Sequence, residues 1–222
     1  MFRAIVFDLD HTLFDRYATL RSIIESGSAY TIFKKEIPAE TIIEEWFYAD
    51  RHFCPHGWGG VYDHFKEKGL LTEDFERETF FKKQIEPLYM NVAVPFPFTI
   101  PLLNELKNRN YKIGLITNGD HILQMKKLEM LGLDSIFDQI VISHDYGTDK
   151  PDRVLFDKMG ELLGIPNNEM IYVGDHPLND VEASRKAGYT PVWVKTSGIW
   201  THPEIEKCEL QVDNVSQLLD IL

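Results

Sequence analysis

The stretch "VFDLDHTLFD", residues 6–15, decides how the rest of the chain is interpreted. A short apolar run, residues 4–7, leads directly into Asp8 and Asp10, with Thr12 close behind. An apolar run of this length that is bounded by charge is typical of a buried β-strand. Side chains two positions apart in a strand point the same way, so Asp8 and Asp10 are expected to face one side together. Two carboxylates at the end of a buried strand require a cation that neutralises them, or they take part in a reaction.

Composition limits the function classes that remain. The chain has 222 residues, 44% of them hydrophobic and 26% charged, which is typical of a soluble globular enzyme. Its net charge of −12 argues against binding to a nucleic acid polymer or an anionic membrane. Cys54 and Cys208 are far apart and form no CxxC motif, which favours a reducing compartment. The apolar start is too short for a signal sequence or a membrane span, so we expect a cytoplasmic protein.

The chain shows two successive secondary-structure patterns, a helical one and then an alternation of strands and helices. Apolar residues recur at helical spacing from 16 to 90, and the segment "CPHGWGG" (54–60) is expected to interrupt these helices as a loop. Strands and helices alternate after residue 99. Strands are expected in "YKIGLIT", "FDQIVIS", "EMIYVGD", "TPVWVK" and "ELQVD", and helices over 121–131, 153–163, 178–187 and 215–222. Glycines follow the first three of these helices, which is a typical C-terminal signal.

This alternation predicts βαβ units and an α/β fold. The expected core is a Rossmann-like parallel sheet with helices on both faces, formed by residues 1–14 and 96–222. Residues 15–95 are then an inserted α-helical cap domain that follows the first strand.

Polar residues stand where the predicted strands end. In an open parallel sheet, ligands bind at the carboxyl ends of the strands, near the point where the strand order reverses. Residues expected at this edge are Asp8, Asp10, Thr117, Asn118, Lys150, Asp175 and Asp180, with Lys150 directly after the third strand. Each of them alone has an ordinary explanation as a turn, cap or helix-start residue. Their positions at successive strand ends favour a shared site.

The carboxylates of Asp8, Asp10 and Asp175 would repel one another unless something neutralises them. Mg²⁺ prefers oxygen ligands and would do so. Alternatively, one carboxyl keeps its proton because its neighbours raise its pKa. Both arrangements are useful together, since one carboxylate could attack while another donates a proton.

Four motifs follow one another along the chain: "DLDHT" (8–12), "ITNG" (116–119), "KPDRVLF" (150–156) and "GDHPLND" (174–180). In this order they resemble the motifs of the haloacid dehalogenase superfamily. The resemblance implies a phosphohydrolase with a helical cap after the first motif. It also implies that Asp8 is the nucleophile and that Asp10 is the general acid and then the general base. Mg²⁺ would be held by Asp8, by the backbone carbonyl of Asp10, and by Asp175.

The resemblance further implies that Thr117 and Lys150 hold the phosphoryl oxygens and that Asp180 supports Lys150 and metal-bound water. The candidate phosphate- and substrate-binding residues are Thr12, Trp58, Thr117, Asn118 and Lys150. Phosphoryl transfer depends mostly on positioning and charge neutralisation, which a cation and a lysine would supply.

The expected function is that of a Mg²⁺-dependent phosphatase acting on small phosphate monoesters. Dehalogenases of the superfamily lack an acidic residue two positions after the nucleophile, so Asp10 disfavours a 2-haloacid dehalogenase. Phosphomutases share Asp10 and stay open as an alternative. A non-catalytic phosphate-binding regulator is the alternative from another class.

The sequence limits the identity of the substrate less than it limits the type of reaction. The aromatic residues between 46 and 65 either pack the cap helices or, with His52, His56 and Trp58, line a pocket for the leaving group. "TNGD" (117–120) and "WVKTSG" (193–198) resemble 5′-nucleotidases and N-acylneuraminate-9-phosphatases of the superfamily. We rank nucleoside 5′-monophosphates first, sugar phosphates second and phosphoglycolate third. The expected partner is a small-molecule phosphate ester, and the protein is expected to be a monomer or a homodimer.

Overall fold

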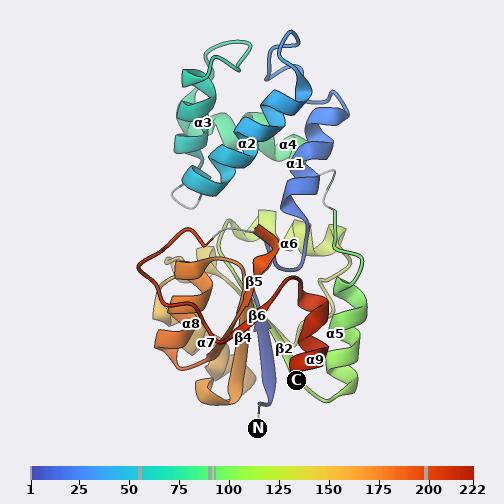
Figure 1. Cartoon of the computed structure of the whole chain (residues 1–222), viewed down its shortest axis with the longest axis vertical. Coiled ribbons are helices and arrows are strands. Elements are labelled where there is room, and N and C mark those ends of the chain that lie inside the picture. Colours follow the sequence, from blue (N-terminus) through green and yellow to red (C-terminus); the bar gives the residue numbers. More distant parts are fainter. Residues whose placement is uncertain (1, 55–56, 90–91, 93, 198–199) are drawn as a thin grey trace. The chain divides into compact units, whose positions relative to one another are not determined.

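The computed structural model describes residues 2–54, 57–89, 92, 94–197 and 200–222. The chain divides into two compact units (Figure 1). Residues Met1–Asp15 and Pro95–Leu222 form the first unit, and residues Arg16–Val94 form the second. The second unit is therefore an insertion between the first strand and the remainder of the first unit.

A parallel sheet forms the centre of the first unit. Among the described residues its strands are β1 (Ala4–Phe7), β2 (Lys112–Thr117), β3 (Gln139–Ile142), β4 (Met170–Gly174), β5 (Thr190–Val194) and β6 (Leu210–Val212). The strand order is β3-β2-β1-β4-β5-β6, and every pair is parallel. The chain runs outward from β1 to β3 and then returns to place β4 beside β1. The order thus reverses between β1 and β4, and the predicted α/β fold is confirmed.

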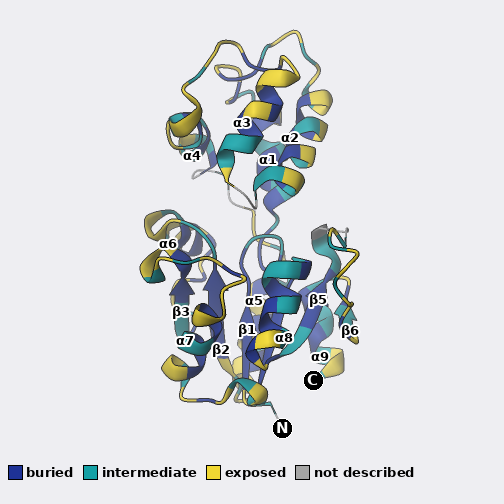
Figure 2. Ribbon diagram, turned by 90° about the vertical axis from the view of Figure 1, so that its left-hand side faces the viewer, coloured by how far each residue is buried: buried dark blue, intermediate teal, exposed yellow. Residues whose placement is uncertain are grey.

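The central strand β1 ends in register with both neighbours. Phe7 pairs with Leu115 of β2 and with Val173 of β4. All four residues of β1 are buried, because strands flank it on both sides and helices cover both faces of the sheet (Figure 2). The Asp8 N–H donates to the Val173 carbonyl at 2.9 Å, which fixes where the first carboxylate leaves the sheet.

Helices cover both faces of the sheet (Figure 1). They are α5 (Thr99–Asn108), α6 (His121–Met130), α7 (Arg153–Leu163), α8 (Ala183–Ala187) and α9 (Leu218–Ile221). Helices α7 and α8 pack on one face, and α5 and α9 lie on the other, while α6 lies beyond the carboxyl ends of β2 and β3 (Figures 1 and 2). This is the two-layer covering that a parallel sheet requires.

Close packing of α7 on the sheet depends on a glycine in β2. A Cβ added at Gly114 would lie 2.7 Å from the sulfur of Met159, so a larger residue would displace the Met159 side chain from the sheet. Met159 and Phe156 of α7 are buried against the sheet together with Val6 and Ile116. Each such apolar side chain contributes about 1.5–3 kcal/mol when it is fully buried.

Short helical turns connect the strands, and three of them differ from expectation. Strand β3 ends at Ile142 and is followed by the 3₁₀ turn η4 (Ser143–Tyr146), so Lys150 does not follow the strand directly. The segment 178–187 begins as the π turn η6 (Pro177–Glu182) before α8, because the N–H groups of Asp180 and Val181 both donate to the His176 carbonyl. The C-terminal segment divides into the 3₁₀ turn η8 (Val215–Gln217) and α9. The remaining turns of this unit are η5 (Asn167–Glu169) and η7 (Lys195–Ser197).

The second unit is helical, as predicted. Its elements are α1 (Arg16–Glu25), α2 (Ala39–Phe53), α3 (Trp58–Glu67), η2 (Arg77–Thr79), η3 (Phe81–Ile85) and α4 (Glu86–Tyr89). A cluster of buried aromatic rings lies between its helices. The ring centroids of Phe33, Trp46 and Phe65 are 5.2–5.7 Å apart. These three aromatics therefore form the core of this unit.

The predicted loop over 54–60 is confirmed as a break between α2, which ends at Phe53, and α3, but its last three residues are helical, because α3 begins at Trp58 and includes both following glycines. A Cβ at Gly59 would lie 2.7 Å from the guanidinium of Arg77, and one at Gly60 would lie 2.9 Å from the Cβ of Phe53. The glycines thus allow close approach at the first turn of the helix. The glycines, which the sequence analysis interpreted as a sign of a loop, therefore serve close packing.

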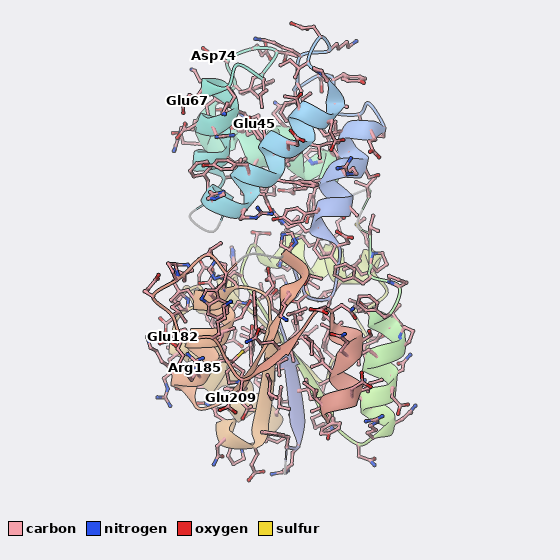
Figure 3. All side chains as sticks on the ribbon, viewed as in Figure 1. Glu45, Glu67, Asp74, Glu182, Arg185 and Glu209 are labelled. Atoms are coloured by element: carbon pink, nitrogen blue, oxygen red, sulfur yellow. The ribbon has the colours of Figure 1, made fainter. Side chains whose placement is uncertain are left out.

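The charged side chains lie mainly at the surface (Figure 3). Glu67, Asp74 and Glu209 are exposed, and Glu182 accepts a hydrogen bond from Arg185 at 2.6 Å. Glu182 and Arg185 are half-buried, and surface ion pairs contribute only about 0–1 kcal/mol each, so such pairs do not determine the fold. Within the described part of the chain, no helix combines the length and apolar character needed to cross a bilayer.

Candidate active site

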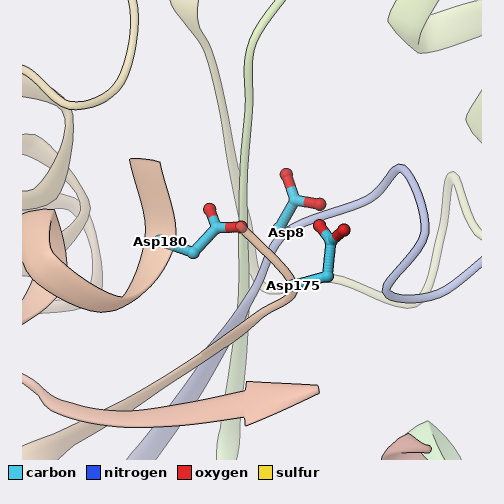
Figure 4. Close-up of side chains that lie close together, drawn as sticks. All are labelled: Asp8, Asp175 and Asp180. Atoms are coloured by element: carbon cyan, nitrogen blue, oxygen red, sulfur yellow. The ribbon is translucent and has the colours of Figure 1, made fainter. Parts of the chain in front are cut away.

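Three carboxylates meet where the strand order reverses (Figure 4). Asp8 follows β1, Asp175 follows β4 and Asp180 lies in η6. One oxygen of each lies within 4.8 Å of the others, and the residues are 8%, 9% and 1% exposed, respectively. Carboxylates this close and this buried stay ionised together only when cations neutralise them. An all-oxygen donor set of this kind suits a hard divalent cation.

Lys150 supplies one positive charge to this cluster. Its Nζ donates to Asp8 Oδ1 at 2.6 Å and to Asp180 Oδ1 at 2.7 Å. It also lies 3.0 Å from the hydroxyl of Tyr172 and 3.3 Å from the carbonyl oxygen of Ile116. The buried ammonium therefore joins the nucleophile candidate to the supporting carboxylate.

The electrostatics of this cluster affect Asp8 most clearly. Burial raises the pKa of Asp8 to about 7, although Lys150 opposes the shift and the carboxylates of Asp180 and Asp10 add to it. Burial lowers the pKa of Lys150, but Asp180 and Asp8 outweigh it and hold that pKa above its ordinary value. Lys150 thus stays charged, while an added cation would favour the ionised form of Asp8.

The motif "GDHPLND" folds back to orient Asp180. A Cβ at Gly174 would lie 2.4 Å from the carboxyl carbon of Asp180, so this position requires a glycine. The His176 N–H donates to Asp180 Oδ2 at 2.9 Å. The His176 ring nitrogen Nδ1 accepts the N–H groups of Leu178 and Asn179 and so caps η6. Both the glycine and the cap are therefore part of how the carboxylate reaches the site.

Asp10 has a different partner from the other carboxylates. Lys127 Nζ donates to both of its oxygens, at 2.9 and 3.0 Å. Gln124 Nε2 lies 3.4 Å from Asp10 Oδ2 and donates to Thr117 Oγ1 at 2.5 Å. A side-chain network thus connects the candidate acid to the candidate phosphate-binding hydroxyl.

Asn118 anchors the segment that carries Lys150. Its Oδ1 accepts the Lys150 N–H at 2.8 Å, and its Nδ2 donates to the Lys150 carbonyl at 3.1 Å. Both ends of the amide are engaged, so the side chain sets the backbone position of the lysine. The Lys150–Pro151 peptide is cis. Direct phosphate binding by Asn118 stays a prediction.

Two other predicted residues, Thr12 and Trp58, have surroundings of their own. The hydroxyl of Thr12 is fully buried and has no hydrogen-bond partner among the described residues. Trp58 belongs to the second unit, where its ring stacks on Phe81 with the centroids 4.2 Å apart. Their roles in substrate binding stay predictions, as does that of the exposed His52. Pro55, His56 and Gly198, which the sequence analysis also named, lie outside the described residues.

Sequence reasoning missed three polar residues of the site: Tyr172, Gln124 and Lys127. Tyr172 lies within the apolar run of β4, and its hydroxyl is 3.2 Å from Asp180 Oδ1. A tyrosine in a fully buried strand needs a partner for its hydroxyl, so its position in the sequence was a signal for a polar contact. Gln124 and Lys127 gave a weaker signal, since polar residues on a helix are expected to face solvent.

Known proteins resemble this chain in sequence and in fold. A family model described as "Haloacid dehalogenase-like hydrolase" matches residues 5–194. A glyceraldehyde 3-phosphate phosphatase of Methanothermobacter thermautotrophicus is 30% identical over 247 residues, covering 100% of both chains. The pyrimidine 5′-nucleotidase YjjG of Escherichia coli is 38% identical over 104 residues, covering 46% of each chain.

A solved structure shows the same fold. The putative HAD-hydrolase YfnB from Bacillus subtilis, bound to magnesium, aligns with a TM-score of 0.75 at 21% identity. The alignment covers 100% of this chain and 98% of that one. At this level of identity the likeness concerns the arrangement of strands and helices.

Proposed function

Because the chain belongs to the haloacid dehalogenase-like hydrolase family, we propose that it is a Mg²⁺-dependent phosphatase of small phosphate monoesters with Asp8 as nucleophile. The family predicted from the four motifs is confirmed. Two of its relatives are named as phosphatases, one of glyceraldehyde 3-phosphate and one of pyrimidine 5′-nucleotides. The observation that carries the proposal is the buried cluster of Asp8, Asp175 and Asp180 beside Lys150.

In the first step, a carboxylate oxygen of Asp8 attacks the phosphorus atom of the ester. The bond between phosphorus and the alcohol oxygen breaks, and that oxygen takes a proton from Asp10. Lys150 and Thr117 hold the non-bridging oxygens, where negative charge is concentrated. These groups are positioned before the substrate arrives, which is how enzymes stabilise this kind of transition state.

In the second step, water attacks the phosphorus atom of the aspartyl phosphate. Asp10 accepts the proton of the water, and the bond between phosphorus and Asp8 breaks. Inorganic phosphate leaves, the Asp8 carboxylate is restored, and Asp10 is protonated again for the next cycle. The same carboxyl thus serves first as acid and then as base.

The donor set fits Mg²⁺. Asp8 and Asp175 offer carboxylate oxygens, and we assign both as ligands together with the backbone carbonyl of Asp10. Asp180 lies within 4.8 Å of both but accepts from Lys150 and from the His176 N–H, so we assign it a supporting role. When bound, Mg²⁺ would neutralise the surplus carboxylate charge and polarise the phosphoryl group.

We assign the second unit, residues 15–95 in our sequence-based boundaries, as a cap that selects the substrate. The residues around Asp8 can contact only the phosphate, so they cannot distinguish one alcohol from another. Discrimination needs a surface for the leaving group, and the aromatic-rich helices of the second unit can provide one. The substrates that we propose to test are nucleoside 5′-monophosphates, glyceraldehyde 3-phosphate, other sugar phosphates and phosphoglycolate.

A cytoplasmic location is part of the same proposal. Cys54 and Cys208 both carry free thiols, which suits a reducing compartment.

The deciding experiment measures phosphate release across this substrate panel, with Mg²⁺ and with EDTA. We expect turnover of at least one substrate, and we expect EDTA to abolish it. Asp10→Asn should slow phosphate release by about 10²–10⁴-fold, which is the usual contribution of a positioned acid or base. Thermal melting of the variant controls for loss of the fold.

Three other outcomes would replace the proposal with one of its alternatives. Metal-independent release of halide from a 2-haloacid would show a dehalogenase. Transfer of the phosphoryl group to another hydroxyl of the substrate would show a phosphomutase. Binding of inorganic phosphate without turnover of any substrate would favour the regulator.

A further inference from the structure

We propose that Lys127 and Gln124, on the buried face of α6, are positioning residues that hold Asp10 and Thr117 for the proposed reaction. This inference rests on the proposed phosphatase function and adds a second lysine to it. Lys150 serves the nucleophile and the phosphate, whereas Lys127 serves the acid.

The burial of Lys127 is the first observation. The residue is 4% exposed, and its Nζ contacts both oxygens of Asp10. An ammonium group is costly to bury unless a carboxylate neutralises it. Contact with both oxygens restricts the rotation of the carboxyl group as well as its place. Lys127 Nζ also lies 5.6 Å from the ring centroid of Phe14, whose backbone forms a β-bridge with Asp10.

Gln124 adds a directional effect. The amide nitrogen of Gln124 faces Asp10 and donates to its Oδ2 at 3.4 Å. That nitrogen also donates to Thr117 Oγ1 at 2.5 Å. Since the hydroxyl oxygen accepts from Gln124, the Thr117 O–H points its own proton toward another acceptor. A phosphoryl oxygen of the substrate is the acceptor that the proposed reaction supplies.

A single helix carries both groups. Gln124 and Lys127 are three residues apart in α6, so they lie on one face of it. The Asp120 side chain caps the helix by accepting the Leu123 N–H at 3.2 Å. A Cβ at Gly119 would lie 3.2 Å from the amide carbon of Gln124, so the glycine leaves room for that side chain. A site built on a capped helix holds its geometry better than one built on a loop.

The consequence concerns the leaving group. An alkoxide leaves poorly and needs the proton of Asp10, whereas p-nitrophenolate leaves readily without it. If Lys127 acts through Asp10, its loss should therefore harm hydrolysis of an alkyl phosphate far more than hydrolysis of p-nitrophenyl phosphate. A purely structural lysine would affect both substrates alike.

The experiment compares kcat/KM for p-nitrophenyl phosphate and for a simple alkyl phosphate, because this constant reports formation of the aspartyl phosphate. Lys127→Met should lower the alkyl value by roughly 10²–10⁴-fold, as Asp10→Asn does, and the aryl value by less than about tenfold. The double variant should be no slower than Asp10→Asn, since coupled residues are not additive. Lys127→Arg should retain most of the activity on both substrates.

The neighbouring Lys126 is exposed and provides a matched control, since Lys126→Met makes the same change on the solvent face of α6. We expect its constants to equal those of the wild type. Gln124→Met should raise the inhibition constant for inorganic phosphate by roughly 2–12-fold, the range that one hydrogen bond contributes. Lys127→Met should leave that constant unchanged.

Equal losses on both substrates in Lys127→Met, with additive losses in the double variant, would overturn the inference. Should Lys127→Met fail to fold, the ratio of alkyl to aryl kcat/KM in Lys127→Gln decides instead. A ratio equal to that of the wild type would again overturn the inference. If the wild type releases no phosphate from any ester, the proposed function fails and this inference fails with it.

Discussion

The two units each bury a cluster of charged groups, and the two clusters differ in composition. In the second unit, Arg16 meets Asp50 at 2.6–3.1 Å and donates to the Tyr89 hydroxyl at 3.2 Å. In the first unit, oxygens of Asp8, Asp175 and Asp180 lie within 4.8 Å of one another, and Lys150 contacts Asp8 and Asp180. We call the Arg16–Asp50 contact the matched pair and the three carboxylates the acidic cluster, because a guanidinium faces a carboxylate in the first and carboxylates gather in the second.

The pKa shifts of the two clusters reflect this difference. Burial lowers the pKa of Arg16, but Asp50 outweighs it and holds that pKa above its ordinary value. Burial raises the pKa of Asp8 to about 7, and Lys150 does not cancel the shift. Arg16 therefore stays charged, which is typical of a structural ion pair. Asp8 is partly protonated near neutral pH, which is typical of a functional site.

The largest effect is expected at the acidic cluster of Asp8, Asp175 and Asp180. Asp8→Asn removes the nucleophile, because an amide does not attack phosphorus, and should reduce turnover to background while leaving the melting temperature equal or higher. Residual turnover above about one-hundredth of the wild-type rate would contradict nucleophilic catalysis by Asp8. Phosphate release and thermal melting of the same preparation provide the two readings.

Breaking the matched pair should instead cost stability. Asp50→Ala removes the carboxylate that the buried guanidinium of Arg16 contacts and should lower the free energy of unfolding by about 3–5 kcal/mol. Combining Arg16→Met with Asp50→Leu removes both charges and should recover most of the loss. Urea denaturation measures all three proteins. An equally large loss in the double variant would show that the apolar packing around the pair, rather than the charge, stabilises the second unit.

A smaller effect concerns pH in the metal-free protein. The folded-state pKa of Asp8, about 7, lies above its ordinary value of 3.8. The unfolded chain therefore loses this proton at lower pH, and the contribution of Asp8 to stability falls as the pH rises through about 4 to 7. Asp8→Asn should flatten this part of the profile of unfolding free energy against pH, measured in EDTA. Identical profiles for both proteins would contradict the assigned pKa.

The smallest effect is expected at Trp58. Since the ring is half-buried and stacks on Phe81, Trp58→Ala should change the ranking of phosphate esters while altering p-nitrophenyl phosphate hydrolysis only by a few-fold. Phe81→Ala removes the stacking partner and keeps the tryptophan, so it is the matched control. A lower melting temperature in both variants, with an unchanged ranking, would place Trp58 in the packing of the second unit only.

The sequence was most informative where apolar strands end in polar residues. Strand β1 and the carboxylate that follows it could be predicted, because a buried parallel strand reads as a short apolar run. The carboxyl edge then follows from topology, which brings Asp8, Lys150, Asp175 and Asp180 together.

The sequence was least informative on α6. Ile122 is 74% exposed there, whereas Gln124 and Lys127 are buried beside Leu128, so its buried face carries two polar residues. Nothing in a single sequence distinguishes a lysine that pairs with Asp10 from a solvated one, because the partner is more than a hundred residues away. The prediction of a loop after Gly57 was wrong for another reason. The local composition indicated a loop, but Gly59 and Gly60 lie in α3, where they pack closely against Arg77 and Phe53.

The central claim is that Asp8 carries the phosphoryl group during turnover. The most direct measurement quenches the enzyme in acid during steady-state hydrolysis of its best substrate with Mg²⁺ and examines the peptide containing residues 4–15 by mass spectrometry. We predict one phosphoryl group on Asp8 in the wild type, more of it in Asp10→Asn, and none in Asp8→Asn. A fully active enzyme whose peptide is never phosphorylated at Asp8 would contradict the account.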